Sequence, residues 1–126
     1  MERALNHAGL KPEQIDYINL HGTGTRFNDA AEDLAVHAIF GDRPACSSTK
    51  GWSGHTLGTA GALEAIISLL CIREELLPGC LNVSTLDPDL RSNVITVNRP
   101  AAVRRVLSNS FGFGGNNCSL ILGLAA

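Results

Sequence analysis

Hydrophobic and polar residues alternate along the chain in blocks that predict helices and strands in turn. Residues 2–8 are typical of a short helix, and residues 15–20, rich in Ile, Leu and Tyr, predict a buried strand. Residues 28–40 predict a second helix, capped by Asn28 and Asp29. Its apolar positions fall on one helical face, which we expect to pack against the core: Ala31, Leu34, Ala35, Ala38 and Ile39.

The second half of the chain predicts one long helix among several strands. Small and apolar residues indicate a helix from Gly54 or His55 to about Glu75. Because small residues let a helix approach another backbone closely, we place this helix centrally. Four further segments predict strands: residues 44–49, 93–98, 103–110 and 118–124. The order of elements indicates a layered α/β domain, with a sheet that is parallel at first and ends antiparallel.

Composition narrows the range of partners. The chain has 126 residues, 44% of them hydrophobic, which indicates a single domain with an ample core. A net charge of −2 and 5% aromatic residues give no basis for nucleic-acid or membrane binding. The start of the chain lacks the hydrophobic stretch of a signal peptide. The four cysteines show no CxxC spacing, and we expect reduced thiols and a cytoplasmic location.

Three glycine-framed motifs contain the candidate chemistry. The first is His21-Gly22-Thr23-Gly24-Thr25, and the second is Lys50-Gly51-Trp52-Ser53-Gly54-His55. The third is the glycine-rich segment 109–117, a turn between two predicted strands. Each histidine stands where an apolar run ends and small residues begin, a position that presents a side chain at the lip of a cleft.

Taken together and in this order, the motifs resemble the C-terminal half of β-ketoacyl-acyl-carrier-protein synthases with a Cys-His-His site. The resemblance covers nearly the whole chain and implies a thiolase-like fold, of which residues 1–126 form only the second α/β half. Family members are longer, and their nucleophilic cysteine lies in the N-terminal half, which is absent here. We therefore expect the isolated chain to have no condensing activity.

The resemblance also implies roles for individual residues in a decarboxylative Claisen condensation. Malonyl on a carrier protein loses carbon dioxide, and the carbanion attacks an acyl chain held as a cysteine thioester. Neutral His21 and His55 would donate hydrogen bonds to the malonyl thioester oxygen as charge builds up there. Lys50 would disfavour imidazolium, and Glu64 could pair with it. Phe113 would control access to the acyl pocket, with its backbone N–H completing an oxyanion hole.

Substrate contacts follow from the same resemblance. Thr23 and Thr25 resemble threonines that hydrogen-bond the phosphopantetheine arm of the carrier protein, while Phe111 and Gly114 complete the expected substrate-binding set. No other cofactor is expected. Some family members hold a structural cation at positions matched here by five residues with oxygen ligands, for which an ordinary buried polar network is the alternative: Asn19, Glu32, Glu64, Ser108 and Asn109.

Cysteine placement argues against a nucleophile within this chain. Cys46 superficially copies a nucleophile context, but no long helix follows it within reach, so we interpret it as a strand residue. Cys71, Cys80 and Cys118 lie in apolar sequence and are interpreted as packing residues.

Two alternatives stay open at this point. A thiolase would share the fold but would need a Cys-x-Gly turn near the C-terminus, whereas Cys118 is followed by Ser119 and Leu120. The chain could instead be a chain-length-determining or interaction subunit. We expect three partners: an acyl carrier protein, the N-terminal half, and a second copy of the chain that would cover the exposed apolar face of the central helix.

Overall fold

A mixed four-stranded sheet forms the middle layer of the computed structural model, which describes residues 1–124. The strands lie in the order β2-β1-β5-β6, with β1 parallel to both β2 and β5, and β6 antiparallel to β5. Their bounds are Ala45–Ser47 for β2, Tyr17–Asn19 for β1, Arg105–Phe111 for β5 and Asn117–Gly123 for β6. The predicted α/β sheet, parallel and then antiparallel, is confirmed.

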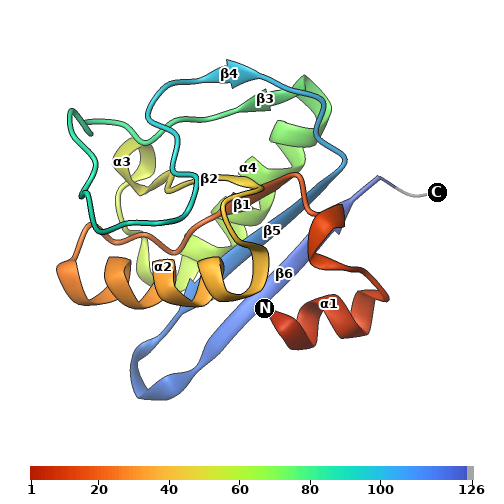
Figure 1. The fold of residues 1–126 in the computed structure, drawn as a ribbon, viewed down its shortest axis with the longest axis horizontal. Helices are drawn as coiled ribbons and strands as arrows, with labels where there is room; N and C mark the ends of the chain where they lie inside the picture. Colours follow the sequence, from red (N-terminus) through yellow and green to blue (C-terminus); the bar gives the residue numbers. More distant parts are fainter. Residues whose placement is uncertain (125–126) are drawn as a thin grey trace.

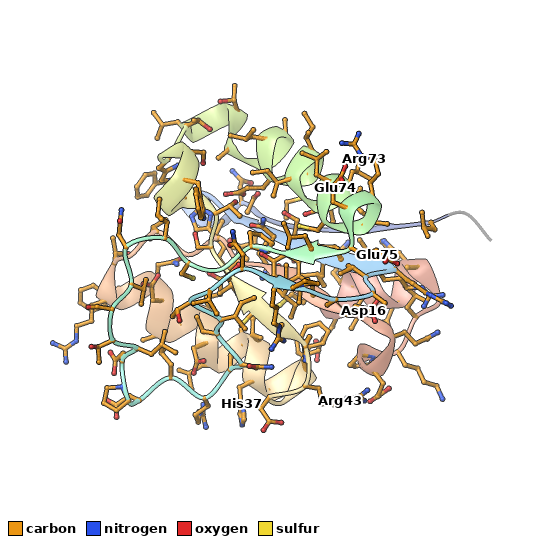
Figure 2. All side chains as sticks on the ribbon, turned by 90° about the horizontal axis from the view of Figure 1, so that it is seen from above. Asp16, His37, Arg43, Arg73, Glu74 and Glu75 are labelled. Carbon is orange, nitrogen blue, oxygen red and sulfur yellow. The ribbon has the colours of Figure 1, made fainter. Side chains whose placement is uncertain are left out.

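Helices cover both faces of this sheet (Figures 1 and 2). On one face lie α1 (Glu2–Ala8) and α2 (Arg26–Phe40), and on the other lies α4 (Ala60–Glu74). The alternation of side chains along β1 separates the two cores, because Ile18 packs with α1 and α2 whereas Tyr17 packs with α4. The sheet therefore has one buried cluster on each side.

Short elements connect these layers. The helix α3 spans Lys50–Ser53, and a two-stranded antiparallel pair joins β3 (Leu76–Leu77) to β4 (Arg99–Pro100). Three single 3₁₀ turns complete the described elements: Pro12–Gln14, Leu57–Thr59 and Phe113–Gly115. Figure 1 shows α3 and the irregular 80–92 loop beside one another, near the N-terminal half of α2.

The buried face of α2 differs from the predicted one. The helix begins at Arg26 with Thr25 as its N-cap, and its buried residues are Glu32, Asp33, Val36 and Phe40. Leu34, predicted to face the core, is 58% exposed. The prediction failed because it counted only apolar positions, whereas the two carboxylates are directed inward, where backbone N–H groups of two loops satisfy them.

The helix predicted from Gly54 or His55 begins later, at Ala60. Gly54 and Leu57 both have positive φ angles, 73° and 53°, so no continuous α-helix can run from Gly54 into α4. His55 therefore lies on a loop before α4. The buried face of α4 includes Glu64 and Ser68, and its outer face exposes a group of large apolar side chains: Ile66, Leu69 and Leu70.

Two further predictions about strands and cysteines need correction. Residues 93–98 form no regular strand, and only Val94 pairs with β2, in a parallel bridge to Cys46. Cys118 is exposed on the edge strand β6 rather than packed in the core. Cys46 is a buried strand residue as predicted, and burial raises the pKa of its thiol to about 12.

Candidate active site

His21 follows the carboxyl end of β1 and is held there through its backbone. The N–H groups of His21 and Gly22 donate to the two carboxylate oxygens of Glu32, each at 2.9 Å. Gly22 has a φ of 34°, and a Cβ at this position would lie 2.5 Å from the Cβ of Ser48. Only glycine fits this turn, and the neighbouring His21 is 7% exposed.

The structure brings His21 and His55 together, as the sequence predicted. Their ring centroids lie 5.5 Å apart, with the rings nearly perpendicular at 85°. His55 is exposed, and its Nδ1 accepts the backbone N–H of Leu57 at 3.2 Å. A nitrogen that accepts a hydrogen bond carries no proton, so Nε2 is the nitrogen of this ring that can donate.

Electrostatics keep the His21 ring neutral. Burial lowers its pKa from 6.5 to about 4, and the charges of Lys50 and His55 act in the same direction. Asp29 acts weakly in the opposite direction. The Nδ1 atom of His21 is buried and has no hydrogen-bond partner among residues 1–124. At neutral pH the His21 imidazole is therefore uncharged, and it lies beside the ring of His55.

Lys50 lies at the start of α3 and is buried against α4. Its Nζ forms an ion pair and hydrogen bond with Oε1 of Glu64, as predicted from the sequence. Burial raises the pKa of Glu64, while the hydrogen bond and the charge of Lys50 act to lower it. Lys50 comes from α3 and Glu64 from α4, the helices on either side of the His55 loop. Their ion pair therefore holds the Lys50 ammonium group near the histidines.

The glycine-rich hairpin places its two phenylalanines differently. The ring of Phe111 lies 5.5 Å from that of His21, whereas the side chain of Phe113 is fully exposed at the tip of the hairpin. Gly114 has a φ of 79°, which permits the sharp turn between β5 and β6. In this structure Phe111, and not Phe113, therefore contacts the histidine pair.

The two threonines of the first motif contact one another. The hydroxyl groups of Thr23 and Thr25 lie 2.8 Å apart, and both side chains are at least partly exposed. Thr25 also caps α2, although its side chain makes no capping hydrogen bond. Both hydroxyl groups therefore stand at the surface of the first motif.

Comparison with known proteins identifies the family. Residues 1–84 match the family described as Beta-ketoacyl synthase, C-terminal domain. The chain belongs to this family. The ketosynthase fold is confirmed by solved structures, which are thiolase-like ketosynthases.

Three relatives illustrate the extent of the similarity. A mitochondrial 3-oxoacyl-[acyl-carrier-protein] synthase of Arabidopsis thaliana is 48% identical over 128 residues, covering 96% of this chain and 28% of that protein. In the complex of ketosynthase ApeO with its chain length factor ApeC from Xenorhabdus doucetiae, the matching chain has a TM-score of 0.93 and 47% identity, covering 99% of this chain and 32% of its own length. AntDE:AntF is a type II polyketide acyl-carrier protein in complex with its ketosynthase. The matching chain has a TM-score of 0.89 and 26% identity, covering 99% of this chain and 32% of its own length. This ketosynthase domain thus spans less than a third of the length of these relatives.

The five cation candidates of the ketosynthase domain separate onto opposite faces of the sheet. Glu32 and Asn109 lie on the α2 side, where the Asn109 amide donates to Glu32 at 3.0 Å. Asn19 and Ser108 are paired in register on β1 and β5 and face α4, as does Glu64. Each of these last three has a buried oxygen without a hydrogen-bond partner in the described part of the chain. These oxygens suit a hard cation, whereas Glu32 and Asn109 already have partners.

A cavity of about 460 Å³ opens beside His55. It is lined by Thr23 and Gly24 of the first motif, by Lys50 and His55 of the second, and by apolar residues of the irregular 80–92 loop: Leu81, Val83, Leu86 and Leu90. No function was predicted for this loop from its sequence. The sequence does contain one indication of this lining. Single apolar residues recur in the loop although the segment has neither helical nor strand periodicity.

Proposed function

We propose that this chain is the histidine-bearing half of a 3-oxoacyl-[acyl-carrier-protein] synthase. The main support is that His21 and His55 converge from two different loops, with their ring centroids 5.5 Å apart. The name of the Arabidopsis thaliana relative supports the same reaction class, an acyl transfer between carrier-bound thioesters.

The chemistry follows from where charge develops. Loss of carbon dioxide from a malonyl thioester leaves the bonding electron pair on the α-carbon, delocalised onto the thioester oxygen as an enolate. Nε2–H of His55 and an N–H of His21 stabilise this oxygen, since preorganised donors act most strongly where charge appears. The α-carbon then forms a bond to the carbonyl carbon of the acyl thioester, and the cysteine thiolate leaves with the electron pair of the broken C–S bond.

The cysteine of this step is proposed to come from the N-terminal part of the synthase. Among the described residues, Cys46 and Cys71 are buried, with pKa values raised to about 12 and about 11 by burial, so neither is a ready thiolate. Burial also raises the pKa of the Cys80 thiol. We therefore expect the 126-residue chain alone to be inactive in condensation.

The proposed partners are an acyl carrier protein, the N-terminal half and a second copy of the chain. The carrier protein in the AntDE:AntF complex and the chain length factor bound to ApeO support partners of these kinds. The exposed Ile66, Leu69 and Leu70 of α4 form an apolar surface suited to one of them. No helix of the described residues is long and apolar enough to cross a membrane. Unpaired cysteines at all four positions support a reducing compartment such as the cytoplasm.

A chain-length-determining subunit is the second candidate, supported by the complex of ApeO with its chain length factor. The presence of His21, His55 and the Lys50–Glu64 pair favours catalysis over this role, because a subunit that only shapes a tunnel has no need of a buried ion pair beside two imidazoles.

Mass spectrometry of intact proteins tests the proposal. The chain is incubated with acyl- and malonyl-carrier thioesters, with and without a separately expressed N-terminal half. We expect acylation on the N-terminal half and formation of a 3-oxoacyl product only in the mixture. His21→Ala and His55→Ala should each lower product formation about 10²-fold or more while acylation persists. His7→Ala, on the exposed face of α1, is the matched control. Acylation of this chain alone would overturn the assignment.

A further inference from the structure

Asp33 is a buried carboxylate for which the proposed mechanism has no use. It lies on α2, is 7% exposed, and follows Glu32 directly in the sequence. An unpaired carboxylate in such a position would be costly, so its partners indicate why it is there. The partners belong to the far end of the 80–92 loop, 58 and 59 residues further along the chain.

The contacts of Asp33 are made almost entirely with backbone atoms of that loop. The N–H of Ser92 donates to Oδ1 at 2.8 Å, and the N–H of Arg91 donates to Oδ1 and Oδ2 at 3.1 and 3.2 Å. The Ser92 hydroxyl donates to the Asp33 carbonyl at 3.4 Å, and the Arg91 guanidinium lies 4.0 Å from the carboxylate. Burial alone would raise the pKa of Asp33, but the hydrogen bonds from Ser92 and Arg91 outweigh it and lower the pKa. The carboxylate is therefore ionised and bonded at neutral pH.

The loop fixed by this contact is one wall of the cavity. Leu81, Val83, Leu86 and Leu90 line it from the loop, while Thr23, Lys50 and His55 line it from the two histidine motifs. The loop contains no helix or strand. Its position beside the cavity therefore depends on backbone contacts at its ends. Glu32 holds the His21 turn in the same way, so two adjacent carboxylates of α2 fix two different walls of one cavity.

The volume and lining of the cavity indicate what it would hold. About 460 Å³ lies within the usual range for a small-molecule site, and a lining of both apolar and polar side chains suits a flexible chain of methylene and amide groups. The lining also includes four carboxylates, those of Asp29, Glu32, Asp33 and Asp87. On the basis of the function proposed above, we propose that Asp33 is a positioning residue that fixes the 80–92 loop as the outer wall of the channel for the carrier protein's pantetheine arm. The arm would enter past Thr23 and end near His55, and Asp33 itself would not touch the reacting atoms.

Two measurements on the 126-residue chain test this role without requiring condensation. In hydrogen exchange, Asp33→Asn should speed exchange of the Arg91 and Ser92 amides and of the 80–92 loop by about tenfold or more, because an amide replaces one acceptor oxygen by a donor and removes the charge. Exchange of the β1 and β5 amides should stay unchanged. In an NMR titration with pantetheine as the probe, the same variant should raise the Kd roughly three- to tenfold.

The control is Asp42→Asn, which removes an exposed carboxylate of the same chemistry outside the cavity. It should change neither exchange of the 80–92 loop nor the Kd for pantetheine. Thermal unfolding of both variants separates local loosening from loss of the fold. If Asp33→Asn proves unfolded, Ser92→Pro, which removes the shortest donor to the carboxylate, provides the same comparison.

Three results would overturn the inference. Unchanged exchange in Asp33→Asn would show that the contact does not hold the loop, and an unchanged Kd would show that the loop is not a wall of the arm channel. A wild-type chain that leaves the cavity resonances unperturbed by pantetheine would exclude that ligand. None of these results alters the complementation experiment above, so failure here and failure of the proposed synthase are distinguishable.

Discussion

At the scale of single residues, the two histidines of the site are held in different ways. His55 is exposed, and its Nδ1 is occupied by the backbone N–H of Leu57. His21 is buried beside Lys50, and the pKa of its ring is lowered to about 4. One ring is thus held in a single tautomer by a hydrogen bond, and the other is held uncharged by burial and a neighbouring cation.

The lowered pKa of His21 makes a prediction about stability and pH. In the unfolded chain the ring binds a proton near pH 6.5, whereas in the folded chain it does so only near pH 4. The unfolded state therefore holds more protons between these values, and the folded state loses stability as the pH falls from 6.5 to 4. Urea unfolding at several pH values should show this loss in the wild type and a shallower dependence in His21→Gln. Equal slopes in the two proteins would contradict the assignment.

The sequence predicted the contacts of residues that belong to a motif, but it did not predict the contacts of buried polar residues outside the motifs. His21, Lys50 and His55 were predicted to converge, and Glu64 was correctly paired with Lys50. Asp33 was not singled out, because nothing local marks an aspartate whose partners lie 58 and 59 residues further along the chain. Such long-range partners are visible only once the chain has folded.

At the scale of elements, α2 shows why apolar spacing alone misplaced a helix. Its stripe of Ala and Leu suggested one face, but the helix turns Val36 and Phe40 inward together with two carboxylates. The hydrogen bonds that these carboxylates accept outweigh the gain from burying Leu34. The start of α4 was misplaced for another local reason, since the positive φ angles of Gly54 and Leu57 leave no helical path through His55.

The orientation of α2 can be checked by a matched pair of substitutions. Val36→Ala should destabilise the fold by about 2 kcal/mol, because it leaves a void among Leu5, Ile18 and Leu107. Leu34→Ser should change the free energy of unfolding by less than about 0.5 kcal/mol, because the side chain lies mostly in solvent. Denaturant unfolding gives both values, and the reverse order would support the face predicted from the sequence.

At the scale of the whole molecule, the outer face of α4 exposes apolar side chains that a self-contained domain would normally bury. The helix packs on the sheet through Glu64, Ser68, Cys71 and Ile72, while apolar side chains line its opposite face. The chain spans 28% of the Arabidopsis thaliana relative, so more protein is available in that enzyme to cover such a surface. The sequence placed this helix centrally for its small residues.

Self-association of the isolated chain should depend on this face. Analytical ultracentrifugation should show dimers or larger species for the wild type, because an uncovered apolar surface favours association. Ile66→Lys combined with Leu69→Lys should shift the population to monomer without loss of stability, since both side chains are half exposed. Arg73→Glu, at the exposed end of α4 labelled in Figure 2, changes charge outside the apolar group and is the control. A wild-type chain that stays monomeric would contradict the prediction.

The two adjacent carboxylates of α2 affect which substitutions around this cavity can accumulate during evolution. Glu32 and Asp33 each accept hydrogen bonds from backbone N–H groups of the loops they hold. Backbone groups are present whatever the side chain, proline apart. Positions 81–92 are therefore free to diversify, and the inner surface of the cavity with them, while the loop stays attached at the same point. A mutational scan should find Arg91 and Ser92 more tolerant than Asp33, because their side chains add only a hydrogen bond at 3.4 Å and an ion pair at 4.0 Å to these backbone contacts.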